Sequence, residues 1–181
     1  MPSRTHSYEL YRQFCTHVST TQLRSIPREK SMEILIDNRQ TRIEIDLDEL
    51  QRKTEKILEE LGCSTAAVIS IVLVNSPEIA SLNLKYRGKE GPTNVLSFSQ
   101  LEGETAGLQT KVLGDVVICT DVAFEDALAL GYSNAEMIVY LLIHGILHLV
   151  GYDHGFTRDE SVMSARLEEI FQMFFTVPIK K

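Results

Sequence analysis

The chain has 181 residues, of which 44% are hydrophobic and 24% are charged, and these values are ordinary for one globular domain. No stretch reaches the roughly 18 apolar residues that a membrane-spanning helix needs, so we expect no membrane partner. The formal net charge is −7, but residues 1–31 carry five basic and two acidic side chains, which leaves −10 on the remainder. This balance excludes binding of nucleic acid through overall positive charge, and any RNA contact needs a local basic patch.

Three cysteines, Cys15, Cys63 and Cys119, are scattered along the chain. An odd number of cysteines without a recognisable secretory signal is typical of a reducing compartment. We therefore expect incidental or buried thiols and a cytoplasmic protein.

Residues 1–31 show no clear hydrophobic periodicity and are rich in Ser, Thr and Arg. Three interpretations are open. The start codon is assigned too far upstream and Met32 is the true start, or the stretch is an organellar transit peptide, or it is a real and mostly disordered extension. The second interpretation predicts an organellar instead of a cytoplasmic location.

Four strands and five helices are predicted from residue 32 onward. Runs of β-branched and apolar residues predict the strands, and apolar residues at helical spacing predict the helices. The expected strands are Ile34–Asp37, Ala66–Val74, Asn94–Ser99 and Leu113–Cys119, and residues 42–45 alternate as an edge strand or its approach does. The expected helices cover residues 47–61, 76–86, 120–130 and 133–150, and a last helix begins at residue 157.

Polar residues mark where these helices begin. The predicted N-caps are Asp46, Ser76, Thr120, Ser133 and Thr157, three of which have a glutamate three residues later, as in a capping box. The order of elements predicts an α+β fold, a single domain with about four strands in one mixed sheet packed with helices. The helix over residues 133–150 is apolar nearly all round at its start, so it should be central.

Three of the five histidines fall in one stretch, His144-Gly145-Ile146-Leu147-His148-Leu149-Val150-Gly151-Tyr152-Asp153-His154. Residues four apart share one face of a helix, so His144 and His148 can bind one metal ion. Gly151 can end the helix in a left-handed turn, after which the chain bends back and His154 can supply a third ligand. Three neutral imidazoles with one open position are the ligand set of a catalytic zinc site.

The apolar segment before His144 favours a metal, because imidazoles in such a helix are costly to bury unless something satisfies them. We expect one Zn²⁺ per chain, although imidazole also suits nickel, copper and iron. The alternative is a structural histidine cluster that holds no metal.

The spacing is that of the zincin motif H-E-x-x-H-x-x-G-x-x-H with one departure, which is Gly145 in place of the glutamate. In zincin peptidases that glutamate is the general base, so this chain is a poor candidate peptidase. Hydrolysis stays open, since zinc itself lowers the pKa of bound water to about 7. We therefore expect a zincin-like, metal-dependent hydrolase.

The histidine stretch resembles the signature of the YbeY family, and three other stretches agree with it. They are Ile34–Asn38, which resembles the family's opening strand, Tyr86–Phe98, which resembles its central loop and strand, and Leu113–Ile118, which resembles its next strand. The resemblance runs from about Met32 to about Phe175. It divides the chain into an N-terminal extension, residues 1–31, and a YbeY-like metal-dependent hydrolase domain, residues 32–181.

The resemblance implies a zinc-dependent endoribonuclease specific for single-stranded RNA. Such an enzyme acts in ribosomal RNA processing, namely maturation of the 3′ end of small-subunit rRNA, and in ribosome quality control. The implied partners are ribosomal RNA and the small ribosomal subunit or its assembly factors. The resemblance also makes Arg87 the catalytic cation, and a guanidinium suits that role because it binds phosphate bidentately.

Several other polar residues each have two interpretations. Asp153 either orients a histidine or belongs to the turn after Gly151. Asp115 either has a capping role at the start of a strand or stands behind a metal ligand. The basic residues Lys85, Arg87 and Lys89 form either a patch for RNA or a solvated loop.

Two rival functions also stay open. One is a zincin-type metallopeptidase, which the histidine spacing favours and Gly145 opposes. The other is a non-enzymatic, metal-stabilised ribosome-assembly factor.

Overall fold

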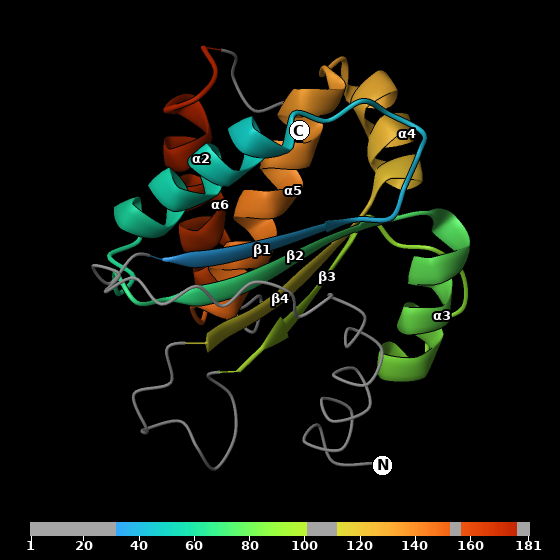
Figure 1. The fold of residues 1–181 in the computed structure, drawn as a ribbon, viewed down its shortest axis with the longest axis horizontal. Coiled ribbons are helices and arrows are strands. Elements are labelled where there is room, and N and C mark those ends of the chain that lie inside the picture. Colours follow the sequence, from blue (N-terminus) through green and yellow to red (C-terminus); the bar gives the residue numbers. More distant parts are fainter. Residues whose placement is uncertain (1–31, 101–111, 153–156, 177–181) are drawn as a thin grey trace, which may run out of the picture.

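The computed structural model of the chain describes residues 32–100, 112–152 and 157–176, and for residues 157–160 the backbone alone. In this part of the chain, strands β1 (Glu33–Asn38), β2 (Val68–Val74), β3 (Val95–Ser99) and β4 (Val112–Cys119) form one sheet (Figure 1). Their order is β1-β2-β4-β3. The first three strands in that order are parallel, and β3 runs antiparallel to β4 at the edge.

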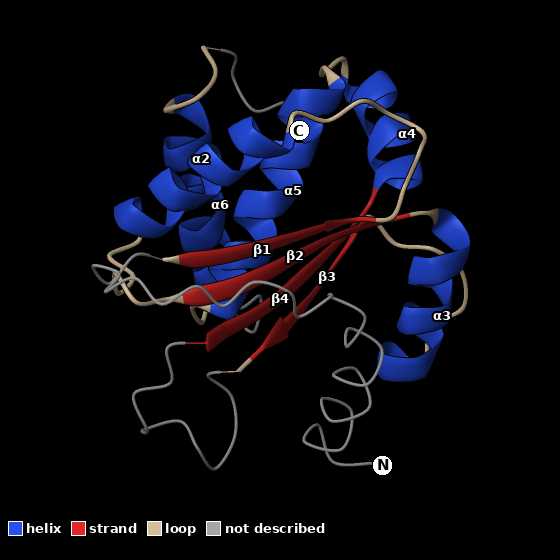
Figure 2. Cartoon of the chain, viewed as in Figure 1, coloured by secondary structure: helices blue, strands red, loops and turns tan. Residues whose placement is uncertain are grey.

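The helices of the described chain cover both faces of this sheet (Figure 2). They are α2 (Leu47–Glu60), α3 (Ser76–Arg87), α4 (Thr120–Leu130), α5 (Asn134–Leu149) and α6 (Thr157–Gln172). Helices α2, α5 and α6 lie together over one face, and α3 packs on the other. Helix α4 follows β4 directly and packs against α5.

Alternate residues of the central strands divide the interior into two clusters. Val116 and Ile118 of β4 pack with Ile71 of β2 on the α5 side. Val117 and Cys119 face the other way and pack with α3. Parallel strands are normally buried on both faces, which is why these strands are apolar at nearly every position.

Helix α5 is the most enclosed helix of the described chain, with ten of its sixteen residues buried. It packs against α2, α4 and α6 and lies across β3 and β4. A complete capping box begins it, because the hydroxyl of Ser133 accepts from the amide of Glu136 at 3.2 Å and the carboxylate of Glu136 accepts from the amide of Ser133 at 2.6 Å. The prediction of a central helix is confirmed.

Among the described residues, no single helix is long and apolar enough to cross a membrane. Helices α4 and α5 satisfy that criterion of length and composition only as a pair, and they are bent by 113° relative to each other where they join. The apolar residues of α5 pack instead against the sheet and the neighbouring helices.

The predicted strands and helices are all present, with small differences at their ends. Residues 42–45, however, form no strand and are the approach to α2. The buried side chain of Gln40 shapes this segment: its oxygen accepts from the amides of Arg42 at 2.7 Å and Ile43 at 3.0 Å, and its nitrogen donates to the carbonyl of Ile43 at 2.9 Å. An amide side chain therefore satisfies the backbone groups that a neighbouring strand would otherwise have to satisfy.

Two predicted caps are wrong by one residue, and the predicted cap at Thr157 stays a prediction because the residues before it and its own side chain lie outside the described part of the chain. Asn75, not Ser76, caps α3, and its side-chain oxygen accepts from the amide of Glu78 at 3.1 Å. Thr120 is the first residue of α4 instead of its cap, and its hydroxyl donates to the carbonyl of Val74 at 3.2 Å. In the second case a buried carbonyl of a neighbouring strand competes for the hydroxyl, which local spacing cannot reveal.

The two described cysteines fit the expectation of incidental or buried thiols. Cys119 is buried and Cys63 is half-buried, and both are free. Burial raises the pKa of the Cys63 thiol. Cys15 lies outside the described residues.

Candidate metal centre

His144 and His148 lie one turn apart on α5 and are both partly exposed. Their Nε2 atoms are 3.2 Å apart, and their rings meet edge to face with centroids separated by 4.8 Å. Spacing of four residues on a helix places side chains next to each other, as predicted. The two nitrogen atoms are therefore within reach of one shared ligand.

This separation fits two ligands of one metal ion. Zinc–nitrogen bonds of about 2.0–2.1 Å at tetrahedral angles place two imidazole nitrogens about 3.3 Å apart. A hydrogen bond between two neutral imidazoles fits the same distance, so a structural cluster is the rival interpretation. Within the described ranges, no Cys, Asp or Glu joins the pair as a third ligand.

The turn after α5 follows the prediction as far as the structure describes it. Gly151 has a φ of 97°, which only glycine adopts readily, and it lies just beyond the helix. The amide of Tyr152 donates back to the carbonyl of Leu147 at 3.0 Å, so the chain folds back over the last turn. Asp153 and His154 lie outside the described residues, and the third ligand stays a prediction.

Ser99 supports the same turn from the sheet. Its hydroxyl donates to the carbonyl of Leu149 at 3.1 Å. Helix ends leave their last carbonyls without partners inside the helix, and this bond satisfies one of them next to His148. The two residues are 50 positions apart in sequence, so no local pattern could have indicated the contact.

Gly145 brings α5 close to the sheet. A Cβ atom at this position would lie 2.6 Å from Cγ1 of Val116 and 3.2 Å from the hydroxyl oxygen of Ser97, and the first of these distances is one that real Cβ atoms essentially never show. Zincin peptidases carry their catalytic glutamate at the corresponding position of the motif. This chain lacks both that carboxylate and the space for its side chain.

Arg87 is the last residue of α3, and its side chain is exposed. Helix α5 packs on β3 and β4 from one face of the sheet, and α3 packs on β4 from the other face, with its Tyr86 against Phe98 of the edge strand β3. Among the described residues, no hydrogen bond or ion pair engages Arg87. The structure thus brings His144 and His148 together and places Arg87 at the end of α3, the helix that packs on the opposite face of the sheet.

Asp115 lies in the middle of β4 and points away from α5, since its neighbour Val116 faces Gly145. The structure therefore supports neither of the two roles expected for it. Asp115 is 9% exposed and accepts a hydrogen bond from Ser70. Burial raises the pKa of this carboxyl from 3.8 to about 6, and the bond from Ser70 opposes that rise only in part.

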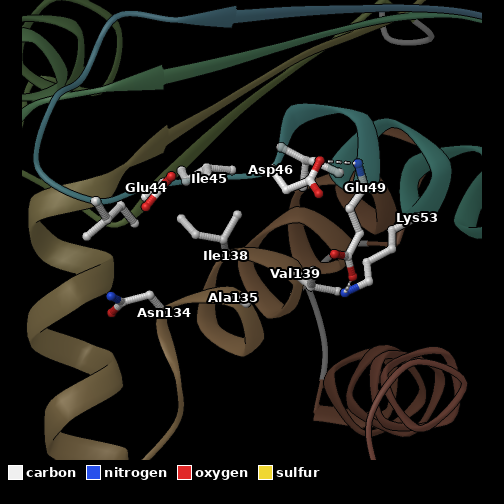
Figure 3. A pocket seen from close by; sticks show the side chains of 11 residues that line it. Glu44, Ile45, Asp46, Glu49, Lys53, Asn134, Ala135, Ile138 and Val139 are labelled. Carbon is white, nitrogen blue, oxygen red and sulfur yellow. Dashed lines mark hydrogen bonds and ion pairs between the residues drawn. The ribbon is translucent and has the colours of Figure 1, made fainter.

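A pocket lies between the beginning of α5 and the beginning of α2 (Figure 3). Neither His144 nor His148 lines it, and the nearest lining residue along α5 is Val139, five residues before His144 and so about 7.5 Å away along the helix. Its lining is largely aliphatic, with Ile45 and Ile138 near the centre. This pocket is therefore distinct from the histidine pair.

At the rim of the pocket, the beginning of α2 differs from the predicted capping box. Asp46 caps α2 as expected, because its side chain accepts from the amide of Glu49 at 2.9 Å. The carboxylate of Glu49 does not return to the cap but pairs with Lys53 at 2.7 Å (Figure 3). The lysine one turn further along the helix competes successfully for that carboxylate.

Comparison with known proteins assigns the family. The family model described as Endoribonuclease YbeY matches residues 35–174. The chain belongs to the YbeY family. The YbeY match includes Arg87 and the whole histidine stretch and leaves residues 1–31 outside, as the resemblance predicted.

Individual YbeY relatives agree with this assignment. An Endoribonuclease YbeY from Syntrophus aciditrophicus is 36% identical over 151 residues, which cover 82% of this chain and 94% of that protein. Another from Syntrophotalea carbinolica is 42% identical over 58% of this chain and 71% of its own length. The solution structure of TM1509 from Thermotoga maritima is similar with a TM-score of 0.50 and 25% identity, over 79% of this chain and 91% of that one. The predicted α+β fold with a mixed four-stranded sheet is confirmed.

Proposed function

We propose that this chain is a metal-dependent endoribonuclease that cleaves single-stranded RNA. Membership of the YbeY family, whose relatives are named endoribonucleases, is the observation that carries the proposal. The spacing of the His144 and His148 nitrogens supports it, because 3.2 Å suits two ligands of one ion. A bound zinc ion supplies Lewis-acid chemistry and a water of lowered pKa.

Each proposed site residue has a distinct task. His144 and His148, with His154 from the segment outside the described residues, hold one Zn²⁺ per chain. Arg87 binds the phosphoryl oxygens of the RNA and stabilises the negative charge that develops on them during cleavage. Its exposed position at the end of α3 leaves the guanidinium available to a ligand.

The arrangement of α3 and α5 around β3 suggests how the RNA lies. The histidine pair and Arg87 come from helices that both contact the edge strand β3, α5 by packing on it and α3 through Tyr86 on Phe98, and in the described sheet β3 has a neighbour on one side only. We therefore place the RNA across the edge of the sheet at β3. The exposed Lys85 and Lys89 beside Arg87 supply the local positive charge that the acidic domain otherwise lacks.

The proposed biological substrate is ribosomal RNA. The chain acts in maturation of the 3′ end of small-subunit rRNA and in ribosome quality control, with the small subunit or its assembly factors as partners. The proposed location is the cytoplasm, or an organelle if residues 1–31 are a transit peptide. The family resemblance is the support for these finer statements.

Metal content tests the centre. The purified protein should hold about one zinc per chain, measured by elemental analysis. His148→Ala removes one ligand from the helix and should lower the zinc content sharply. A wild-type protein that purifies without transition metal and cannot be loaded with it would favour the structural histidine cluster.

Cleavage assays separate the three candidate functions. The zinc-loaded protein should cleave single-stranded RNA and leave casein intact. Arg87→Lys keeps the charge but loses the planar guanidinium, so this variant should lose most RNA cleavage while it still binds zinc. Casein cleavage by the wild type would support the peptidase, and zinc binding without cleavage of either substrate would support the assembly factor.

A further inference from the structure

Asn83 is a polar residue inside α3 that is only 4% exposed. Its side-chain nitrogen donates to the carbonyl of Gly91 at 3.0 Å. Its side-chain oxygen is buried without a hydrogen-bond partner. A buried amide with an unsatisfied oxygen is costly, and a leucine of similar size would avoid that cost. The stability of the helix alone therefore does not explain an asparagine at this position.

Asn83 ties down the loop that follows α3. Its backbone carbonyl accepts from the amide of Lys89 at 3.4 Å, and its side chain holds Gly91 two residues later. Gly88 and Gly91 have φ angles of 67° and 84°, so the loop contains two turns that need glycine. One buried residue thus contacts the loop at two points.

The same segment carries the exposed basic residues. Lys85, Arg87 and Lys89 are all exposed and lie within five residues of one another. Between them, the ring of Tyr86 packs edge to face on Phe98 of β3, with centroids 5.2 Å apart. The end of α3 is therefore anchored to the sheet by Tyr86 and to its own loop by Asn83, while the charged groups point outward.

A rigid base under exposed charges has a physical consequence for binding. Long basic side chains lose conformational freedom when they bind phosphate, and a mobile backbone beneath them adds to that loss. A backbone that is already held in place before binding removes the part of the entropy loss that comes from ordering the backbone. The anchored loop is thus suited to present its guanidinium and ammonium groups at a constant spacing.

We propose that Asn83 is a positioning residue for RNA binding, which holds the loop Gly88–Gly91 so that Arg87 and Lys89 meet the phosphates of a single strand together. The proposal rests on the proposed function of this site. Asn83 does not itself touch the RNA, and its effect is transmitted through the backbone of the loop.

A double-mutant cycle tests this proposal. The full chain and its variants Asn83→Leu, Arg87→Ala and the double variant are titrated with single-stranded oligouridylate at several salt concentrations. Asn83→Leu should weaken binding by roughly tenfold. It should also reduce the slope of log affinity against log salt concentration by about the amount that one phosphate contact contributes. In the Arg87→Ala background, the same change should cost less than about twofold, because residues that act through one another are not additive.

A matched control separates positioning from helix stability. Asn75→Ala removes the cap at the other end of α3, where the side chain accepts from the amide of Glu78, and does not touch the loop. It should lower the melting temperature and leave RNA affinity within about twofold of the wild type. Asn83→Leu should instead weaken RNA binding without lowering the melting temperature or the zinc content, because leucine removes the buried unsatisfied oxygen. Asn83→Ala, prepared in parallel, should show the same loss of RNA affinity.

Each alternative outcome has a definite meaning. Wild-type affinity in Asn83→Leu and Asn83→Ala, with weak binding by Arg87→Ala, overturns the positioning role and leaves the proposed function intact. The positioning role is also overturned, and the proposed function left intact, if Asn75→Ala weakens RNA binding as much as Asn83→Leu does. Additive effects of the two changes in the double variant would have the same meaning. Wild-type affinity in Arg87→Ala contradicts the proposed role of Arg87 and the positioning role with it.

Discussion

Asp115 is a single carboxyl in a place where a charge is costly. It lies between Ser70 of β2 and Phe98 of β3, its register partners in the sheet, and it is 9% exposed. Desolvation disfavours the ionised form, so the pKa of Asp115 rises from 3.8 to about 6 in the folded protein. The folded state therefore keeps a proton that the unfolded state has already lost, which couples folding to pH.

The sign of this coupling leads to a prediction for Asp115→Asn. Between pH 3.8 and about 6 the native state binds more protons, so the contribution of Asp115 to the free energy of unfolding falls as pH rises and is fully lost above pH 6. Asparagine keeps the shape without the charge. The variant should gain on the order of 2 kcal/mol relative to the wild type between pH 4 and pH 7, measured by urea unfolding at both pH values. A stability difference that stays constant over this range would contradict the raised pKa.

At the scale of elements, the contact between α5 and the sheet determines what the histidine helix can carry. Gly145 lies against Val116 of β4 and Ser97 of β3, while its neighbour His144 is partly exposed. Successive helix positions are about 100° apart around the axis, so His144 can face the candidate centre while the next residue, Gly145, faces the sheet. The close packing of α5 against the sheet thus requires glycine at position 145, next to the first ligand His144.

This packing predicts that larger residues at position 145 destabilise the fold. Gly145→Ala should lower the free energy of unfolding by about 1–3 kcal/mol, the usual cost of overpacking, and Gly145→Glu by more. Gly145→Glu should also show no protease activity, although it restores the zincin pattern. Urea unfolding measures the first effect and a casein assay the second.

Val116→Ala is the control for the overpacking argument. Alone it leaves a cavity and should destabilise the protein. Combined with Gly145→Ala it should cost less than the sum of the two single changes, because the new methyl group occupies the vacated space. Additive costs would show that the loss does not come from the contact with Val116, since alanine by itself favours a helix more than glycine does.

For the whole molecule, the described elements begin at Glu33 and end at Gln172, close to the span of the family match. The helices and strands within that span bury one another in two clusters on either side of the sheet. We therefore expect the fold to depend little on residues 1–31, which show no apolar periodicity in the sequence.

A shortened chain that starts at Met32 tests this expectation. It should melt within roughly a degree or two of the full chain. We expect the removed residues to bury no apolar surface, so their loss should leave the free energy of unfolding nearly unchanged. Thermal unfolding followed by circular dichroism measures the difference. A large drop would show that residues 1–31 pack against the domain and contribute to its stability.

Local features were predictable in this chain and long-range contacts were not. The helix over residues 134–149 and the turn at Gly151 follow from hydrophobic spacing and from the backbone freedom of glycine. The caps of α3 and α4 were misplaced because neighbouring residues compete for the role and the buried carbonyl of Val74 engages Thr120. Local spacing contains no information about that carbonyl.

Spacing within one element was enough to predict the helices and strands and the meeting of His144 with His148. The order of these elements along the chain was enough to predict the α+β class. The strand order depends on tertiary packing, and so does the placement of α5 and α3 on opposite faces of the sheet, where Tyr86 of α3 meets Phe98 of the edge strand β3. Tertiary packing also decided that Gly145 faces the sheet and that Ser99 supports the end of α5. These contacts join residues far apart in the chain, and close packing of whole elements selects them.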